Sequence, residues 1–458
     1  MKDSFIQEFE IIGLFGYKDI CIQFKNSTLI VIGENGFGKT SILNALNFIL
    51  CHSYQKLLEI KFKSIRLQIF GKDYKFDYSL IEQYADYLKR NQNDDRSMID
   101  FVTSHIPHKT LEAIVSMLDA GKKGDFYTFV NNDEFLKTIP GNILYQEFLA
   151  WNAQNKSFGK LRELENIIDS QNYTILYYPT YRRVEVDYSH LFPMDERRRS
   201  IRMEDSQRSA QGDLNIRFGM RDVSLRIQKI TDIIRKTSLE GFTNVSADVI
   251  HQLLDNSSTE DHSLNCTADE LRIVLDRAGI RLNKSDKDVI LKRFEKNDFE
   301  LRKNTSLLFY LEQLLKIYRN QEKYDSAILR FKDVCNKYLN DKQFVYDASN
   351  VTLQIYRSLN GELLSLEPEN VVELDQLSSG EKQIVSIFSQ IYLELDKKYA
   401  ILFDEPELSL SIFWQENLLP DILASGSCEF LMAVTHSPFI FSEELKQYTV
   451  GMKEFLKK

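Results

Sequence analysis

The feature that most constrains this chain is a glycine-rich segment, GENGFGKTS, at residues 33–41. It follows an apolar run at residues 29–32 that suits a strand buried on both faces, and it precedes an expected helix at residues 42–50. Glycines in the pattern GxxxxGK[ST] let backbone N–H groups curl around phosphate oxygens, and the helix start adds its positive dipole end. The segment therefore predicts a strand–loop–helix unit that binds phosphate, with a chance glycine turn as the weaker alternative.

Two side chains of this segment have distinct expected roles. Lys39 supplies a positive charge between the β- and γ-phosphates of a nucleotide, and the Thr40 hydroxyl is a ligand for Mg²⁺. The predicted nucleotide-binding residues are Asn35, Gly36, Gly38, Lys39, Thr40 and Ser41.

A second apolar run, at residues 399–403, ends in the carboxylates of Asp404 and Glu405. At the carboxyl end of a buried strand, Asp404 can be a second Mg²⁺ ligand, and Glu405 is placed to orient or deprotonate the water that attacks a γ-phosphate. An apolar run followed by Asp-Glu is common by itself. Its pairing with residues 33–41 makes the prediction of a catalytic Glu405 specific.

Upstream of that strand, LSSGEKQ at residues 377–383 opens an expected helix. Ser378 and Glu381 have the spacing of a capping box, so one interpretation is a well-capped helix with no further role. In the other interpretation, Ser378 and Gly380 present hydrogen-bond donors at the helix start to a γ-phosphate.

LSSGE resembles the signature motif of ATP-binding cassette (ABC) proteins. The resemblance implies a slow ATPase (ATP phosphohydrolase) with ATP and Mg²⁺ as cofactors, and a homodimer of heads or a higher homo-oligomer. It also implies that the signature residues contact the nucleotide held by the partner head; they are Ser378, Ser379, Gly380 and Glu381. His436, after the apolar run at 430–434, is similar to the family's switch histidine, although a lone histidine at a strand end is usually structural. Residues 408–411 take the place of the family's D-loop.

The intervening sequence indicates several further elements. Alternating apolar and polar residues at 60–76, with a turn at 71–73, predict a meander of strands, and another strand is expected at 174–178. Residues 80–170 are helical in pattern and polar. Long, charged helical stretches fill residues 216–340, where an ordinary helical subdomain is as good an interpretation as a coiled coil because no strict heptad persists. We expect the apolar positions at 307–318 to be exposed and to dock a partner.

The expected fold is α/β: an ABC-type ATPase head with a mixed sheet flanked by helices, in two lobes. Residues 1–215 and 341–458 would form the head, and residues 216–340 an inserted helical or coiled-coil arm that splits it. A head split in this way is similar to the SMC, RecF and OLD branch of the family, whose members act on nucleic acid.

Two short sequence segments, at residues 178–183 and 218–223, resemble ATPases of bacterial anti-phage systems, most of all the PtuA family of Septu and next the AriA family of PARIS. This implies a nucleotide-dependent scaffold or sensor that controls a separate nuclease or toxin effector. Arg182 or Arg183 is a candidate nucleotide or interface arginine. The alternative is a RecF- or SMC-like DNA-repair or chromosome-maintenance ATPase that binds DNA directly. The segment after His436 is short, so any nuclease centre is expected on another polypeptide.

Composition and charge restrict the classes of protein to which this chain can belong. A formal net charge of −9 argues against nucleic-acid binding through overall charge, but leaves a local basic groove open. The 5 cysteines lack CxxC spacing, which predicts neither a disulfide framework nor a zinc ribbon. No apolar run reaches the length of a membrane span and the start of the chain lacks a signal-peptide pattern, so we expect a cytoplasmic protein without a membrane partner.

Overall fold

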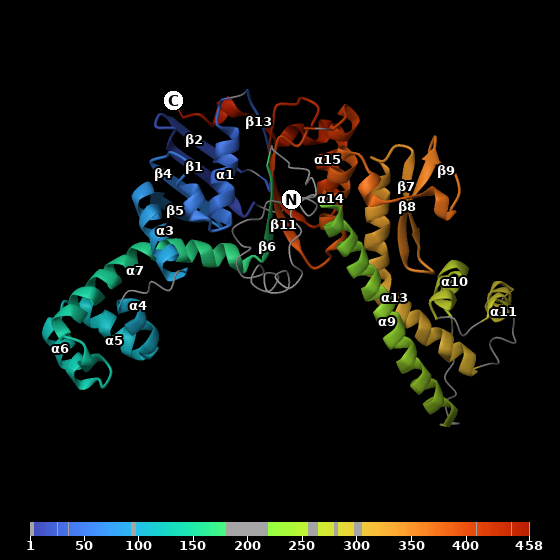
Figure 1. Ribbon diagram of the computed structural model, residues 1–458, viewed down its shortest axis with the longest axis horizontal. Helices are drawn as coiled ribbons and strands as arrows, with labels where there is room; N and C mark the ends of the chain where they lie inside the picture. Colours follow the sequence, from blue (N-terminus) through green and yellow to red (C-terminus); the bar gives the residue numbers. More distant parts are fainter. Residues whose placement is uncertain are drawn as a thin grey trace, which may run out of the picture.

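The computed structural model describes residues 4–24, 26–34, 36–92, 98–179, 219–254, 264–278, 283–296, 305–408, 410–440 and 442–457. A head of sheets and helices lies at the centre, and a helical projection extends from each side of it (Figure 1). Among the described residues, no helix combines the length and the apolar character needed to cross a membrane.

The centre of the head is a five-stranded parallel sheet with the order β13-β3-β12-β11-β6. The strands are β3 (Thr28–Ile32), β6 (Tyr173–Tyr178), β11 (Lys398–Asp404), β12 (Cys428–Thr435) and β13 (Thr449–Gly451). Successive residues of β11 enter two different cores, with Ala400 and Leu402 on one face and Ile401 and Phe403 on the other. Because both faces are covered, the strand is a continuous apolar run, which confirms the prediction of buried strands.

The first lobe covers one face of this sheet. It contains α1 (Lys39–Leu50), the short α2 (Tyr54–Leu57) and an antiparallel sheet with the order β2-β1-β4-β5. The bounds of these strands are Ile6–Leu14 for β1, Lys18–Gln23 for β2, Ser64–Ile69 for β4 and Lys72–Asp77 for β5. The pair β4–β5 confirms the strands that the alternating pattern predicted. The expected combination of parallel and antiparallel strands is therefore present, in separate sheets.

A helical projection leaves the first lobe at the lower left of Figure 1. It consists of α3 (Tyr78–Gln92), α4 (Met98–His105), α5 (His108–Asp119), α6 (Lys123–Asn132) and the 30-residue α7 (Gly141–Ser170). Phe158 and Leu161 of α7 pack in the core of the lobe, whereas Leu144 and Phe148 pack with α4–α6 in a core of their own. The sequence predicted helices here, but it gave no sign of this second core.

The second lobe covers the other face of the parallel sheet. Its helices α14 (Ser379–Leu393) and α15 (Ile412–Ala424) share a core with the inner ends of α9 (Met220–Leu254) and α13 (Thr305–Asn336). A small antiparallel sheet, ordered β10-β8-β7 with β9 paired to β8, lies beside them. Its strands are β7 (Lys342–Asp347), β8 (Thr352–Leu359), β9 (Glu362–Leu363) and β10 (Val371–Val372). Short 3-10 helices are η1 (Leu136–Thr138), η3 (Pro368–Asn370), η4 (Leu374–Gln376), η5 (Glu443–Tyr448) and η6 (Met452–Phe455).

The arm at the lower right of Figure 1 is built on α9 and α13, which run side by side away from the head. Two shorter helices, α10 (Ala268–Arg277) and α11 (Lys284–Glu295), accompany them. The prediction that the apolar stripe of α13 is exposed is wrong. Leu308 and Leu311 are buried against α10 and α11, and Leu314 and Leu315 against α10, because these helices cover the stripe.

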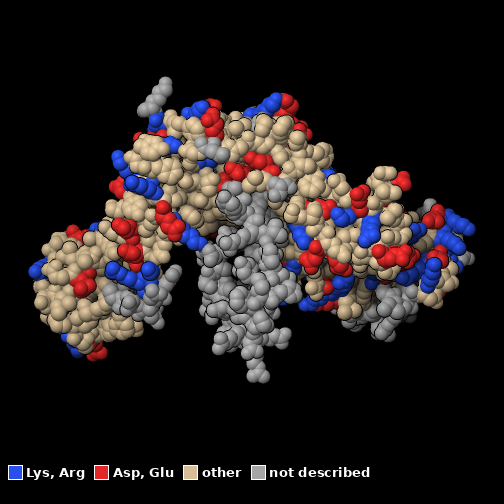
Figure 2. All heavy atoms as spheres, turned by 45° about the horizontal axis from the view of Figure 1, so that its top comes forward, with Lys and Arg blue, Asp and Glu red and all other residues tan. Residues whose placement is uncertain are grey.

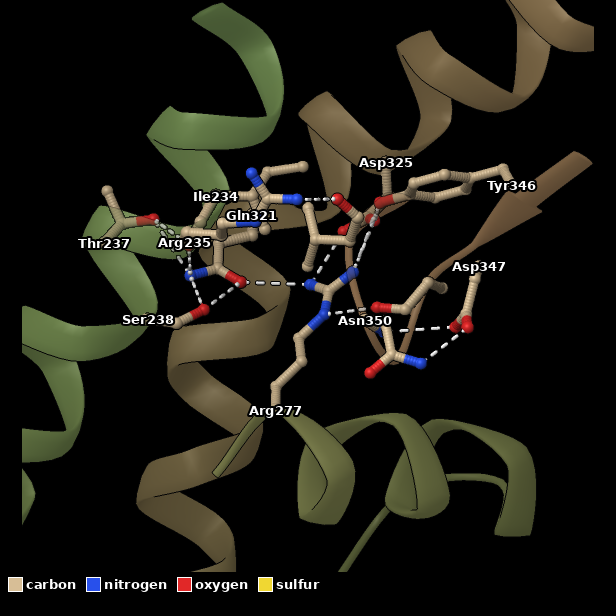
Figure 3. A network of polar contacts seen from close by, with 12 residues as sticks. Ile234, Arg235, Thr237, Ser238, Arg277, Gln321, Asp325, Tyr346, Asp347 and Asn350 are labelled. Atoms are coloured by element: carbon tan, nitrogen blue, oxygen red, sulfur yellow. Dashed lines mark hydrogen bonds and ion pairs between the residues drawn. The ribbon is translucent and has the colours of Figure 1, made fainter. Parts of the chain in front are cut away.

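A buried polar network joins the arm to the small sheet (Figure 3). Arg277 of α10 forms an ion pair of 2.6 Å with Asp325 of α13, and their side chains are 3% and 7% exposed. Tyr346 of β7 donates a hydrogen bond to the same carboxylate. Arg277 also donates a hydrogen bond to the side-chain oxygen of Gln321 of α13, at 3.0 Å. The side-chain amide of Gln321 in turn donates to the hydroxyl of Ser238 of α9, at 2.9 Å. One guanidinium thus connects three helices and a strand.

Candidate functional site

Three of the predicted site segments meet where the parallel strands of the head end, whereas the signature residues lie apart from them at the start of α14. The glycine-rich loop follows β3, Asp404 is the last residue of β11, and His436 follows β12. In the sheet, β12 lies between β3 and β11. Because the carboxyl ends of parallel strands share one edge of a sheet, three segments far apart in sequence surround one place.

The loop at 33–41 has the backbone geometry that phosphate binding requires. Gly36 and Gly38 have φ values of 83° and 88°, in the left-handed region that favours glycine. A Cβ on Gly38 would lie 3.0 Å from Cε2 of Phe15, so a larger residue would also be crowded. Helix α1 begins directly after Gly38, and Ser41 is half-buried in its first turn. Asn35, the remaining predicted residue of the loop, lies outside the described residues.

Lys39 is the first residue of α1 and only 6% exposed. Its Nζ atom donates to the carbonyls of Gly33 and Glu34 at 2.6 and 3.0 Å, and lies 2.7 Å from Nε2 of His436. Burial lowers the pKa of Lys39, because a charged ammonium loses hydration there. Three carboxylates act against this shift: Glu405, Asp404 and Glu407.

The two predicted Mg²⁺ ligands are neighbours although they are 364 residues apart in the chain. The Thr40 hydroxyl donates to Oδ1 of Asp404 at 3.1 Å, and Asp404 is 1% exposed. A hydroxyl beside a carboxylate is a pair of hard oxygen donors, the kind of ligand that Mg²⁺ prefers. These residues therefore fit the ion.

Glu405 and His436, the predicted catalytic residues, are also in contact. Oε1 of Glu405 lies 3.2 Å from Nε2 of His436. Glu405 has a φ of 50°, and its N–H donates to the carbonyl of Val434 at 2.8 Å, so a tight turn follows β11. Nε2 of His436 can accept a hydrogen bond from Lys39 or donate one to Glu405, but it cannot do both at once. The tautomer of His436 therefore depends on which of these two neighbours it bonds.

The signature residues form a capped helix start, as the capping-box prediction stated. Glu381 N–H donates to Oγ of Ser378 at 3.4 Å, and Ser378 N–H donates to Oε2 of Glu381 at 2.7 Å. Lys342 of β7 donates to Oε1 of Glu381 at 2.8 Å. Burial acts to raise the pKa of Glu381, but the hydrogen bonds from Lys342 and Ser378 outweigh it and lower the pKa overall. Gly380 is buried, whereas Ser378 and Ser379 face solvent at the start of α14.

Sequence reasoning missed a third carboxylate at this edge of the sheet. Oε1 of Glu407 accepts hydrogen bonds from the backbone N–H groups of His436 and Ser437, at 2.8 and 3.1 Å. The phrase DEPE at residues 404–407 was the only available sign. Of the other predicted positions, Ser409 of the D-loop segment, Arg182 and Arg183 lie outside the described residues.

A second feature that the sequence analysis did not identify is the turn between β1 and β2, which borders the glycine-rich loop. Lys18 donates to the carbonyl of Gly36 at 3.0 Å, and its Nζ lies 5.4 Å from the ring centre of Tyr17. Phe15 and Tyr17 are 39% and 74% exposed. Two accessible aromatic rings beside a phosphate-type loop offer a flat apolar surface to a ligand. The phrase FGYK at residues 15–18 could have indicated them.

Comparisons with known proteins identify the family of the chain. The family model described as AAA ATPase domain matches residues 5–441. The DNA replication and repair protein RecF of Rickettsia akari (strain Hartford) is 27% identical over 124 residues, which are 26% of this chain and 33% of RecF. This chain therefore spans about a third of the length of that relative.

Among solved structures, the Smc head domain with an extended coiled coil, bound to the C-terminal domain of ScpA and derived from Pyrococcus furiosus, is 13% identical with a TM-score of 0.32. The match covers 98% of this chain and 93% of that chain. An SmcHead bound to the C-winged helix domain of ScpA is 12% identical with a TM-score of 0.32, covering 98% and 94% of the two chains. Since the family model spans nearly the whole sequence, the chain belongs to the AAA ATPase domain family, and RecF is among the proteins to which it is similar.

Proposed function

We propose that this chain binds and hydrolyses Mg-ATP as an ABC-type ATPase, and that two copies act together. One observation carries the proposal: the edge of the parallel sheet gathers a lysine, a hydroxyl–carboxylate pair and a glutamate–histidine pair around a glycine loop. These five side chains are Lys39, Thr40, Asp404, Glu405 and His436. Each group matches one requirement of phosphoryl transfer to water.

Binding begins at the loop. Its backbone N–H groups and the start of α1 bind phosphate oxygens, and Lys39 adds the cation. A γ-phosphate oxygen would take the place of His436 as an acceptor for the Lys39 ammonium. Thr40 and Asp404 would hold Mg²⁺, which neutralises phosphate charge when bound.

Hydrolysis then depends on Glu405 and His436. Glu405 follows the buried end of β11 and is placed to orient the attacking water and accept its proton. His436, with Nε2 within 3.2 Å of that carboxylate and 2.7 Å of Lys39, is placed to contact the γ-phosphate. The exposed rings of Phe15 and Tyr17 provide a stacking surface for the base of the nucleotide.

Pairing of two copies is the second part of the proposal. Ser378 and Ser379 are exposed at the start of α14, where helix N–H groups attract a phosphate. Large apolar side chains are also exposed in the segments that follow β11 and β12: Leu408, Ile412, Phe413 and Phe439, each at least 39% exposed. We infer that these surfaces meet a second head, so that α14 of one copy completes the ATP site of the other in a homodimer or a higher homo-oligomer.

We further propose the division into a head of residues 1–215 and 341–458 and an arm of residues 216–340. In the cell, the ATPase would act as a nucleotide-dependent scaffold or sensor in anti-phage defence and control a separate nuclease or toxin effector. Support comes from the resemblance of residues 178–183 and 218–223 to the ATPases of Septu and PARIS. Co-purification with a nuclease or toxin encoded by a neighbouring gene, in an ATP-dependent manner, tests this role.

A RecF-like repair ATPase that binds DNA directly is the second candidate, favoured by the sequence similarity to RecF. The charge distribution gives it little support, because basic and acidic residues are interspersed over the surface seen in Figure 2 and the net charge is −9. Tight DNA binding by the isolated chain that weakens steeply with salt would select this candidate over the first.

The ATPase proposal is tested by Glu405→Gln, which keeps the shape of the side chain and removes its basicity. Mg-ATP should bind with parental affinity, while turnover falls roughly 100-fold or more. Phosphate release and calorimetry measure the two quantities. Glu147→Gln, on the exposed side of α7, is the control. Parental turnover in Glu405→Gln would show that another group is the base.

A further inference from the structure

The position of His436 is fixed through its backbone by a residue from a neighbouring strand end. One carboxylate oxygen of Glu407, Oε1, accepts the N–H of His436 at 2.8 Å and the N–H of Ser437 at 3.1 Å. Glu407 belongs to the loop after β11, and the two N–H groups belong to the loop after β12. A single carboxylate therefore connects the loop that carries Glu405 to the loop that carries His436.

A second set of hydrogen bonds connects the same two loops to α15. The Ser437 hydroxyl donates to Oε1 of Gln415, in the first turn of α15, at 2.7 Å. The Gln415 amide donates to the carbonyls of Glu407 and Leu410, at 3.4 and 3.0 Å. The backbone carbonyl of Glu407 is therefore bonded to Gln415, while its side chain is bonded to the backbone N–H of His436.

The chemistry of these contacts favours a carboxylate at this position. Hydrogen bonds from N–H groups to a charged oxygen are roughly twice as strong as those to a neutral acceptor. The second oxygen of Glu407, Oε2, is buried and has no hydrogen-bond partner among the described residues. Burying a carboxylate oxygen without a hydrogen-bond partner costs folding free energy. A contribution to stability alone therefore does not explain why a glutamate occupies position 407.

The backbone position of His436 determines where its ring lies relative to the other residues of the candidate site. Its Nε2 lies 2.7 Å from Nζ of Lys39 and 3.2 Å from Oε1 of Glu405. The contact with Glu405 is at the upper end of the hydrogen-bond range, so a displacement of about 1 Å away from that carboxylate breaks it. A misplacement of that size costs on the order of 100-fold in rate when it affects a reacting geometry.

We propose that Glu407 is a positioning residue of the ATPase site: through the N–H groups of His436 and Ser437, it holds the histidine ring between Lys39 and Glu405. The inference rests on the proposed ATPase function, because the histidine is positioned for that reaction. Glu407 itself is not the base. Its bonded oxygen is committed to two backbone donors, whereas Glu405 faces His436 through its side chain.

The first test compares Glu407→Ala with Glu407→Gln. Alanine removes the acceptor, whereas glutamine keeps a carbonyl oxygen that can accept both N–H groups. In Glu407→Ala, kcat should fall on the order of 10- to 100-fold at an unchanged Kd for Mg-ATP. Glutamine should rescue part of this loss, and Glu147→Ala on the exposed side of α7 is the control. Parental kcat in Glu407→Ala would overturn the inference.

Hydrogen–deuterium exchange supplies a readout that does not depend on turnover. The amides of residues 436 and 437 should exchange fastest in Glu407→Ala, which removes their acceptor, and at an intermediate rate in Glu407→Gln, which keeps a neutral and weaker acceptor. Unchanged exchange in Glu407→Ala would refute the positioning role, whereas absence of ATP turnover in the parental chain would refute the proposed function.

A double-mutant cycle distinguishes positioning from a general loss of stability. If Glu407 acts through the histidine, Glu407→Ala should change kcat on the parental background and have no further effect in His436→Ala. An equal loss of kcat on both backgrounds would mean that Glu407 acts elsewhere, and would contradict the proposal.

Discussion

The ammonium of Lys39 has neighbours from two strand ends in the candidate site. Two carbonyls of its own loop accept hydrogen bonds from it, and Nε2 of His436 lies 2.7 Å from it. Burial disfavours the charge and lowers the pKa of Lys39, while the carboxylates of Glu405, Asp404 and Glu407 favour it. The lysine thus depends on residues from two other strand ends, and a phosphate would add the anionic acceptor for which this position is suited.

The corresponding prediction is that Lys39→Ala weakens Mg-ATP binding. A hydrogen bond to a charged group contributes about 1.5–3 kcal/mol, so affinity should fall roughly 10- to 100-fold. Calorimetry with Mg-ATP measures the change, and thermal unfolding checks that the variant is folded. Lys446→Ala, an exposed lysine in η5, is the control. Equal affinities in Lys39→Ala and the parental chain would contradict the phosphate-loop assignment.

At the scale of elements, the signature helix α14 is bonded at both ends to other parts of the second lobe. Lys342 of β7 bonds Glu381 near its start, and Arg226 of α9 forms an ion pair of 2.8 Å with Glu394 at its end. The Arg277 network fixes β7 and α9 to α10 and α13. The orientation of α14 is therefore tied to the base of the arm.

This arrangement predicts the effect of breaking the network. Arg277→Ala should destabilise the arm by about 3–5 kcal/mol, because it leaves the buried carboxylate of Asp325 without its cation. Arg277→Met combined with Asp325→Leu should recover much of the loss, since it removes both charges. Denaturant unfolding and hydrogen exchange of α10 measure these effects. Arg272→Ala, exposed on the same helix, should have little effect; a loss equal to that of Arg277→Ala would indicate a general sensitivity of α10.

At the scale of the whole molecule, the proposed pairing of heads makes a prediction for mixtures. Lys39→Ala disables the phosphate loop, and Ser379→Arg blocks the exposed start of α14 while it leaves the Ser378 cap in place. Each variant alone should be inactive, because both sites of its pair are defective. In a mixture, a pair of one Lys39→Ala and one Ser379→Arg chain has one intact site.

Equal amounts of the two variants should therefore recover roughly a quarter of the parental turnover, because half of randomly formed pairs are mixed and each has one working site of two. ATP turnover across mixing ratios measures the recovery, and sizing in the presence of ATP measures the pairing. Lys446→Ala mixed with the parental chain is the control. A mixture as inactive as its components would mean that the sites are not shared between chains.

The sequence by itself determined the local features of this protein, because their physics is local. A glycine loop between strand and helix, an apolar run ending in Asp404 and Glu405, and a capping box at Ser378 and Glu381 all depend on residues within a few positions of one another. Positive φ angles favour glycine, and burial on two faces favours a continuous apolar run, so both are visible as patterns in short segments of sequence. These local patterns were enough to predict the head and the five side chains gathered at its sheet edge, but not Glu407 or the aromatic turn beside the glycine-rich loop.

Only the tertiary structure decided which distant segments meet. Thr40 and Asp404 are 364 residues apart, and the place of β12 between β3 and β11 brings them and His436 together. Glu407 bonds backbone N–H groups, which carry no residue identity, so no sequence pattern could indicate its partner. The apolar stripe of α13 was wrongly expected to be exposed, because periodicity indicates which side of a helix is apolar and not whether another helix of the same chain, here α10 or α11, packs against it.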